Sequence, residues 1–322
     1  MIFRRSSKHD IPLTGEGLSG DTATNLFLAQ VASDYIKESR SRRRWGLFFK
    51  LFFVVYLVLI TYWIFEDDPP GLLESHTALI SIEGVIGTNE NTSENIIGSL
   101  ESAFDSEYTK GIILSMNSPG GTPVQAARIY EEILRLRTLH PLKPFHVVVN
   151  DICASGGYYI AVAAENIYAH PSSLVGSIGV IWDSFGFTGA MEKLGIERRT
   201  VQAGKNKTML DPFAPTSTED FQHMQTLVDD VHDQFIEAVK VGRSGRIADD
   251  SSIYSGLIWS GQRARELGLI DDFGNINGVA RDVIGEDHII DYTIYPGVFE
   301  QIRREIRASI SEWFSIGIQG FR

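Results

Sequence analysis

Three short runs of apolar, largely β-branched residues constrain the fold of this chain more than any other feature. They are Ala78–Val85, Gly111–Met116 and Phe145–Val149. Apolar runs without a polar alternation are typical of strands buried on both faces of a sheet. Segments with helical spacing lie between them. Strands that alternate with helices predict an α/β domain with a largely parallel sheet.

Two long helices are predicted from their start signals. Thr122-Pro123-Val124-Gln125 supplies an N-cap, a proline at the first helical position and a capping-box partner, which opens a helix to about Leu139. A second capping box, Thr216-Ser217-Thr218-Glu219, precedes another long helix. Its apolar residues recur at helical spacing and predict a face buried in the core or in a subunit interface: Phe221, Met224, Val228, Val231, Phe235 and Val239.

Composition excludes several classes of protein. The hydrophobic content of 43% and the charged content of 22% are those of a globular chain rather than a disordered one. A formal net charge of -12 argues against a nucleic-acid partner, because phosphate binding needs a basic surface. With Cys153 as the single cysteine, neither an intramolecular disulfide nor a multi-cysteine zinc site can form.

One segment, Gly46–Phe65, has the length and apolar character of a membrane-spanning helix, and Lys50 is its only charged residue. Arginines precede it at positions 40 and 42–44, whereas Glu66, Asp67 and Asp68 follow it. This asymmetry predicts a cytoplasmic N-terminus and a C-terminal part across the membrane. A cleaved secretory signal is the alternative, but the apolar run is long, starts late and lacks a small-residue cleavage site.

Two glycine-rich turns follow predicted strands. Asn117–Gly121 leaves the second strand, and Ala154–Gly157 follows the third and leads into a helix of small residues, YYIAVAAE. A serine at such a strand-to-helix turn, here Ser155, presents its hydroxyl among free backbone N–H groups that favour a developing oxyanion. Either turn alone is an ordinary connection. Together they can place two N–H donors around one serine.

A nucleophilic serine needs a base. None of the eight histidines stands in a recognisable triad context, and His146 and His170 are interpreted as structural. A lysine can serve if burial brings its pKa toward neutrality, and such a protease becomes more active as pH rises. The segment 204–213 offers Lys205 and Lys207. A loop lysine is usually a solvated surface charge, so the residues alone do not choose between these readings.

Five motifs then occur in a familiar order: NSPGG, ASGGYYIA, LVGSIGVI, GKNKTMLDPF and IWSGQRARELGLID. Over roughly residues 78–280 the chain resembles the signal peptide peptidase A (protease IV) family, in its short form with one catalytic unit. The resemblance implies a crotonase/ClpP-like α/β fold and a serine endopeptidase with a Ser/Lys dyad. It implies no metal and no cofactor.

The resemblance assigns roles to single positions of this sequence. Ser155 of ASGG corresponds to the nucleophile. Lys207 fits the family pattern K-[ST]-x-x-[DE]-P-F and corresponds to the general base, whereas Lys205 lies two positions out of that frame. Ser177 of VGSIGV corresponds to the serine that orients the lysine.

The same resemblance assigns the oxyanion hole to Gly121 of NSPGG and to the amide of Gly156. Cys153 stands where the family more often has a small residue, and is interpreted as a core substitution rather than a rival nucleophile.

The family also implies partners and a location. Its substrates are remnant signal peptides left in the membrane, and it assembles as a homo-oligomeric ring, such as an octamer, in which neighbouring protomers share each site. The implied location is the bacterial inner membrane, with the N-terminus in the cytoplasm and the catalytic domain outside it.

The expected organisation has five parts. Residues 1–45 form a cytoplasmic segment, 46–65 the membrane anchor, 66–77 a linker, 78–285 the peptidase domain, and 286–322 a C-terminal strand with an amphipathic helix at Phe299–Phe314. That helix is expected to dock on a neighbouring copy, on lipid or on its own domain.

Three other readings remain open. A crotonase-type acyl-CoA enzyme would share the glycine-rich turns but would need neither Lys207 nor a membrane anchor. A catalytically silent membrane scaffold of the same fold is disfavoured by the intact pair of Ser155 and Lys207. A capsid-maturation protease on this fold is disfavoured by the predicted transmembrane helix.

Overall fold

A computed structural model describes residues 45–46, 48–60, 74–88 and 91–295 of the chain. The chain divides into two compact units, Met1–Asp68 and Pro69–Arg322. In the first unit, residues 45–46 and 48–60 are helical and nearly all exposed. Across the described ranges, no helix combines the length and apolarity that crossing a membrane requires. The predicted anchor at 46–65 lies partly outside these ranges, and the predicted helix at 299–314 lies wholly outside them.

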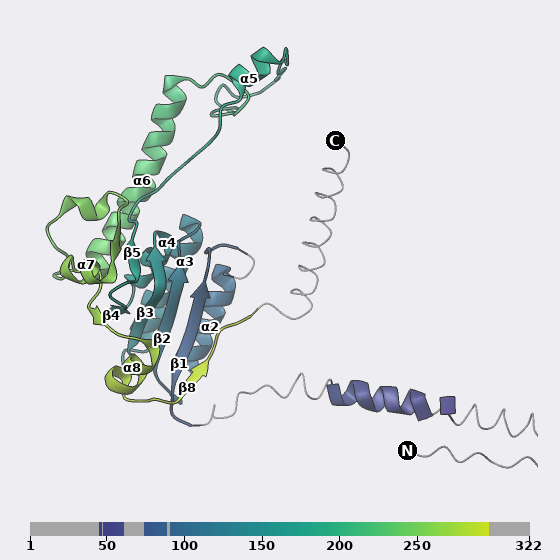
Figure 1. Ribbon diagram of the computed structural model, residues 1–322, viewed down its shortest axis with the longest axis vertical. Coiled ribbons are helices and arrows are strands. Elements are labelled where there is room, and N and C mark those ends of the chain that lie inside the picture. The colour runs from purple at the N-terminus through teal and green to yellow at the C-terminus, as the bar shows by residue number, and fades with distance from the viewer. Residues whose placement is uncertain (1–44, 47, 61–73, 89–90, 296–322) are drawn as a thin grey trace, which may run out of the picture. The chain divides into compact units, whose positions relative to one another are not determined.

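The second unit is built on an eight-stranded sheet with the order β6-β5-β3-β2-β1-β8, while β4 pairs with β3 and β7 (Figure 1). Every pairing is parallel except that of β5 with β6. The predicted α/β class with a largely parallel sheet is therefore confirmed. The strands are β1 His76–Glu83, β2 Thr109–Ser118, β3 Phe145–Ala154, β4 Asn166–Ala169, β5 Leu174–Gly176, β6 Ile258–Ser260, β7 Asp272–Phe273 and β8 Ile289–Asp291.

Helices cover both faces of this sheet. On one face, α2 (Ser93–Asp105), α3 (Pro123–Leu139) and α4 (Gly156–Ala161) pack on the apolar side chains of β1, β2 and β3. On the other face, α8 (Ile276–Gly278) and η2 (Val279–Ile284) cover a smaller cluster. The three central strands are thus buried on both sides, which is why their sequences are apolar without alternation. The remaining helices are α5 Thr188–Lys193, α6 Thr218–Gly242, η1 Ser251–Tyr254 and α7 Gly261–Glu266.

The central strands differ from the sequence prediction at their carboxyl ends. The first ends at Glu83 rather than at Val85, the second continues to Ser118, and the third continues to Ala154. β3 contains a bulge. Met116 pairs with Val149 and Ser118 pairs with Cys153, so one residue of β2 lies opposite three residues of β3. A bulge redirects the end of a strand. Here it carries β3 to the residue just before Ser155.

The predicted helix starts are correct in place but not in every contact. Thr122 caps α3 without a side-chain hydrogen bond, and Gln125 accepts from the backbone N–H of Ser93, while the Thr122 amide donates to Ile86. The capping box of α6 is formed by Ser217 and Asp220, one residue later than predicted. The helix over YYIAVAAE ends at Ala161, since the chain must turn into β4.

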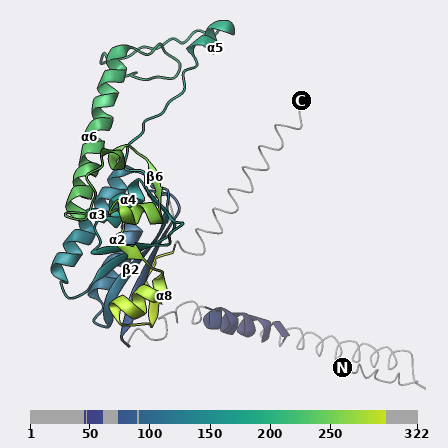
Figure 2. The same cartoon turned by 60° about the vertical axis from the view of Figure 1, so that its left-hand side comes forward.

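The segment from β5 to α6 forms an arm. In Figures 1 and 2 it runs from the sheet past the N-terminal end of α6, with α5 at its far end. Only the C-terminal half of α6 packs on the domain: Phe235 and Val239 are buried, whereas Phe221 is 62% exposed. The apolar stripe on this helix is therefore core in its second half alone.

Candidate active site

Ser155 lies at the turn between β3 and α4, in a backbone conformation that is unfavourable for serine. It is the N-cap of α4, with φ 51° and ψ −123°. A positive φ is uncommon outside glycine, and residues held in such regions cost about 1–3 kcal/mol each. The strain is held in place by β5, whose Gly176 carbonyl accepts a hydrogen bond of 2.9 Å from the Ser155 amide. Strained residues of this kind cluster at active sites, where the strain fixes a side chain's direction.

The two glycine-rich turns pack directly against each other. A Cβ atom at Gly120 would lie 2.7 Å from the Cβ of Ser155, and one at Gly121 would lie 2.0 Å from the carbonyl oxygen of Ile86. No side chain fits at either position, because such contacts are well inside van der Waals distance. Glycine therefore allows the Asn117–Gly121 turn to reach the Ser155 turn.

Gly121 and Gly156 both line the cavity of Ser155, and their backbone amides lie close to each other. The position of a Cβ on Gly156 lies 3.3 Å from the amide nitrogen of Gly121. The turn that contains Gly121 is fixed by two backbone hydrogen bonds: the Ile86 amide donates to the Gly120 carbonyl, and the Thr122 amide donates to the Ile86 carbonyl. Within the described residues, no backbone carbonyl accepts a hydrogen bond from either glycine amide. Two free N–H donors beside a serine hydroxyl are what a tetrahedral oxyanion requires.

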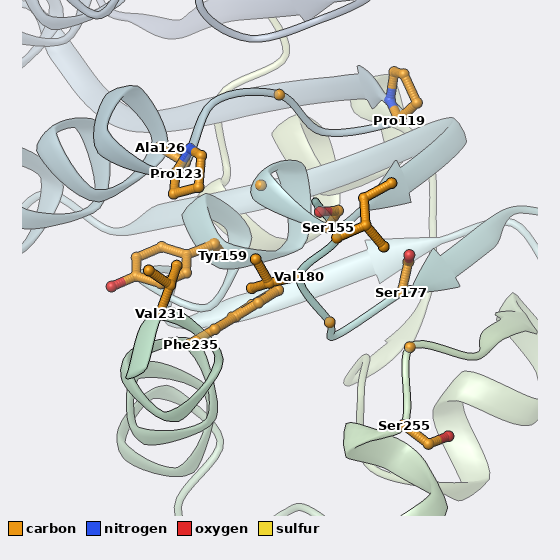
Figure 3. Close-up of a pocket in the computed structure, with 15 residues that line it drawn as sticks. Pro119, Pro123, Ala126, Ser155, Tyr159, Ser177, Val180, Val231, Phe235 and Ser255 are labelled. Carbon is orange, nitrogen blue, oxygen red and sulfur yellow. The ribbon is translucent and has the colours of Figure 1, made fainter. Parts of the chain in front are cut away.

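Ser155 opens into a cavity of about 490 Å³. Ser177 also lines this cavity, and Figure 3 shows Tyr159, Val231 and Phe235 along another wall. The rings of Tyr159 on α4 and Phe235 on α6 lie 5.0 Å apart. This wall is apolar, so the cavity can bury an apolar side chain beside the nucleophile. Other lining residues are Pro119, Gly121, Pro123, Ala126, Gly156, Gly179, Val180, Ile181, Ser255 and Gly256.

Ser177 shares the backbone strain of Ser155. Its φ is 53°, and it directly follows the last residue of β5. Its amide donates to the carbonyl of Leu257 at 2.7 Å, so the turn before β6 fixes it. The structure therefore brings together Ser155, Ser177 and the two glycine amides in one cavity.

Lys207 is not part of this group. It lies on the arm, exposed, and does not line the cavity of Ser155. Lys205 is also exposed and pairs with Glu219 at 3.3 Å. A single copy of the chain thus separates the predicted base from the predicted nucleophile.

The residues after Lys207 give the arm its internal structure. Asp211 pairs with Arg198, and the ring of Phe213 stacks on Phe187 at 5.4 Å between centroids. The Phe187 amide donates to the carbonyl of Pro212 at 2.7 Å. The motif that follows Lys207 therefore connects the outgoing and the returning segment of the arm and fixes the loop that carries the lysine.

Comparison with known proteins places the chain in a family. A sequence model of peptidase family S49 matches residues 138–286, which include Ser155, Ser177 and Lys207. A Synechocystis protein whose name describes a protease is 31% identical over 199 residues, or 61% of this chain and 69% of that protein. The chain belongs to peptidase family S49.

Other similar proteins have names of different kinds. An Enterococcus faecium protein named for signal peptide peptidase SppA is 29% identical over 238 residues, which is 71% of this chain and 69% of that protein. The Na(+)/H(+) antiporter NhaA of Brucella abortus is 41% identical over 220 residues, which is 66% of this chain. The S49 chain spans only 30% of the length of that protein.

Sequence reasoning missed the cavity wall of this S49 site. Tyr159 stands in the ASGGYYIA motif and Phe235 in the apolar stripe of α6, but nothing in either pattern shows that they meet. His146 and His170, interpreted as structural, do not line the cavity. Burial lowers the pKa of His146, which lies on β3. Cys153 is fully buried and burial raises the pKa of its thiol, so it is poorly suited to act as a nucleophile.

Among the residues that the structure describes, no group of three or more histidine, cysteine, aspartate or glutamate side chains could hold a metal ion.

The strain at Ser155 predicts an unusual order of stability. Ser155→Gly should be more stable than Ser155→Ala by about 1 kcal/mol, because glycine tolerates the positive φ and alanine does not. At Ser102, an exposed position in α2, the order should reverse by about the same amount. Urea unfolding of the four variants measures both differences. An alanine variant at 155 as stable as the glycine variant would mean that the turn is unstrained.

Proposed function

We propose that this S49 chain is a membrane-anchored serine endopeptidase in which Ser155 is the nucleophile and Lys207 of a neighbouring copy is the general base. One observation carries the proposal: Ser155 is held in a strained turn with the free amides of Gly121 and Gly156 beside it. Backbone strain of this kind clusters at active sites, and here it fixes the direction of a serine side chain beside two unpartnered amides.

The proposed reaction uses these groups in sequence. An uncharged Lys207 takes the proton of the Ser155 hydroxyl, and the oxygen attacks the carbonyl carbon of a peptide bond. The amides of Gly121 and Gly156 donate hydrogen bonds to the resulting oxyanion. The lysine then returns its proton to the leaving amine, and water hydrolyses the ester on Ser155. Ser177, in the same cavity, can accept a hydrogen bond from the amine and orient it.

The arm supports the sharing of sites between copies. Lys207 is exposed in one copy, so a single copy gives it no apolar surroundings. Apolar side chains along the arm are also exposed, with Ile181 at 88% and Phe185 at 74%. A neighbouring copy that covered this surface would bury these side chains and remove water from the lysine, which favours its neutral form. A homo-oligomeric ring, such as an octamer, would repeat this contact around a closed symmetry.

The apolar cavity beside Ser155 and the name of the Enterococcus relative support remnant signal peptides as substrates. These are apolar segments that remain in the membrane. The proposed location follows from the apolar run at 46–65 and from the charges that flank it: the inner membrane of a bacterium, with the peptidase domain outside the cytoplasm.

A fluorophosphonate probe tests the nucleophile. It should add one phosphonyl group to the purified full-length protein, and mass spectrometry should place that group on Ser155. Ser155→Ala should not react, whereas Ser172→Ala, which removes an exposed serine outside the cavity, should react as the wild type does. Labelling at another serine, or cleavage of casein by Ser155→Ala at the wild-type rate, would refute the proposal.

A further inference from the structure

At the carboxyl end of the sheet, the pairing of β2 with β3 is irregular just before the turn that carries Ser155. β2 and β3 are in register up to Met116 and Val149, and they resume at Ser118 and Cys153. Asn117 is therefore the single residue of β2 that faces the bulge in β3. A bulge interrupts the backbone ladder and leaves its extra residues without a regular partner.

The side chain of Asn117 makes hydrogen bonds where the backbone pairing between the strands is interrupted. Its Oδ1 accepts a hydrogen bond of 3.3 Å from the amide of Ile152, and its Nδ2 donates one of 2.9 Å to Oε2 of Glu83 on β1. Its own carbonyl accepts from the amide of Gly84 at 2.8 Å. One residue thus joins the ends of three adjacent strands.

Each of these strand ends leads to a part of the proposed site. Ile152 lies three residues before Ser155, and Asn117 itself opens the turn that contains Gly121. Gly84 begins the loop in which Ile86 bridges to Gly121. The distance between the serine hydroxyl and the oxyanion donors therefore depends on how these three ends are held together.

We infer that Asn117 is a positioning residue that fixes Ser155 relative to the Gly121 amide through its hydrogen bonds to Ile152 and Glu83. The inference rests on the proposed function of Ser155. A carboxamide suits this role, because it offers an acceptor to an N–H group and a donor to a carboxylate at the same time. Aspartate offers acceptors alone, and leucine offers neither.

The test reverses the polarity of the contact between β1 and β2. Asn117→Asp sets a second carboxylate against Glu83, so the side chain should turn away and release Ile152. Adding Glu83→Gln restores a donor, now on β1, and should let the aspartate return. Glu83→Gln alone keeps an acceptor for Asn117. Asn117→Leu cannot be rescued by Glu83→Gln, and Asn166→Asp makes the same chemical change at the start of β4.

The readout is the fluorophosphonate reaction, resolved into the maximal rate and the half-saturating probe concentration. In Asn117→Asp we expect the maximal rate to fall about tenfold, the effect of losing one positioning hydrogen bond, with little change in half-saturation. In Asn117→Asp/Glu83→Gln it should return to within about threefold of the wild type. Thermal unfolding of each variant shows whether it is folded.

The outcomes separate the two proposals. Wild-type protein that is not labelled at Ser155 would refute the proposed function. The role of Asn117 would be overturned if the wild type is labelled and the maximal labelling rates of Asn117→Asp and Asn117→Leu lie within about twofold of the wild-type rate. That role would also be overturned if Asn117→Asp loses both thermal stability and labelling rate, and if adding Glu83→Gln does not restore the rate. If Asn117→Leu does not fold, the aspartate variant and its rescue decide alone.

Discussion

Replacing Lys207 by methionine is expected to lower the rate of peptide cleavage by at least about a thousandfold, as removal of a member of a catalytic pair does in serine proteases. Methionine keeps most of the length of the side chain and removes the amine. Ser155→Ala should cause a loss of similar size. Lys205→Met is the matched control, since Lys205 lies on the same loop and pairs with Glu219. It should retain nearly full activity.

Mixing the two inactive proteins distinguishes a shared site from a site within one chain. In a closed ring with random order, Lys207→Met copies supply intact serines and Ser155→Ala copies supply intact lysines. About one quarter of the contacts then combine both groups, so activity should return to about a quarter of the wild-type value. The variants are to be dissociated and reassembled together, with the assembled mass confirmed. No recovery in correctly assembled mixtures would exclude sharing. Full activity of Lys207→Met would exclude this base.

The strands could be predicted from the sequence because burial on both faces leaves a run of apolar residues that no other element explains so well. Their ends could not. β3 continues for five residues beyond Val149 because Asn117 and the bulge hold it there, and this contact joins positions 35 residues apart. A pattern that is local in sequence contains no information about it.

The candidate site divides in the same way. The turn at Ser155 is visible in the sequence because glycines surround it, and a serine at a helix start has an evident use. The cavity wall is not, because Tyr159 and Phe235 meet only when α6 packs on α4. The periodicity of α6 is also the same in both halves, although Phe235 is buried and Phe221 is exposed. Periodicity identifies an apolar face, but not what covers it.

The second large effect is expected at the base of α6. Arg243, 1% exposed, caps this helix and donates to both carboxylate oxygens of Asp271, at 2.7 and 3.1 Å. It also donates to the carbonyl of Gly268 at 2.9 Å. Arg243→Met should lower the free energy of unfolding by about 3 kcal/mol, because it leaves a largely buried carboxylate with less compensation. Arg246 also contacts Asp271 but is 35% exposed, so Arg246→Met should cost about 1 kcal/mol or less.

The pH dependence of that cost has a definite sign. Burial alone would raise the pKa of Asp271, but the hydrogen bonds and charge of Arg243 outweigh it, so the pKa is lowered. A carboxylate with a lowered pKa stabilises the fold above its unfolded pKa of about 3.9, and this stabilisation is lost as pH falls through the lower, folded value. Without Arg243 the folded pKa rises. The difference between wild type and Arg243→Met should therefore be largest near neutral pH and shrink in acid.

Urea unfolding at several pH values measures this difference, and a double variant tests its cause. In Arg243→Met/Asp271→Leu no buried carboxylate remains to be compensated, so stability should recover part of the loss and become less dependent on pH. Asp271→Leu also removes the acceptor of the Ile167 amide, so a double variant less stable than Arg243→Met would mean that this bond, the contact with Gly268 and packing outweigh the buried charge. A cost equal to that of Arg246→Met would show that the pair does not anchor α6. The arm that carries Lys207 depends on that anchor, because only the C-terminal half of the helix packs on the domain.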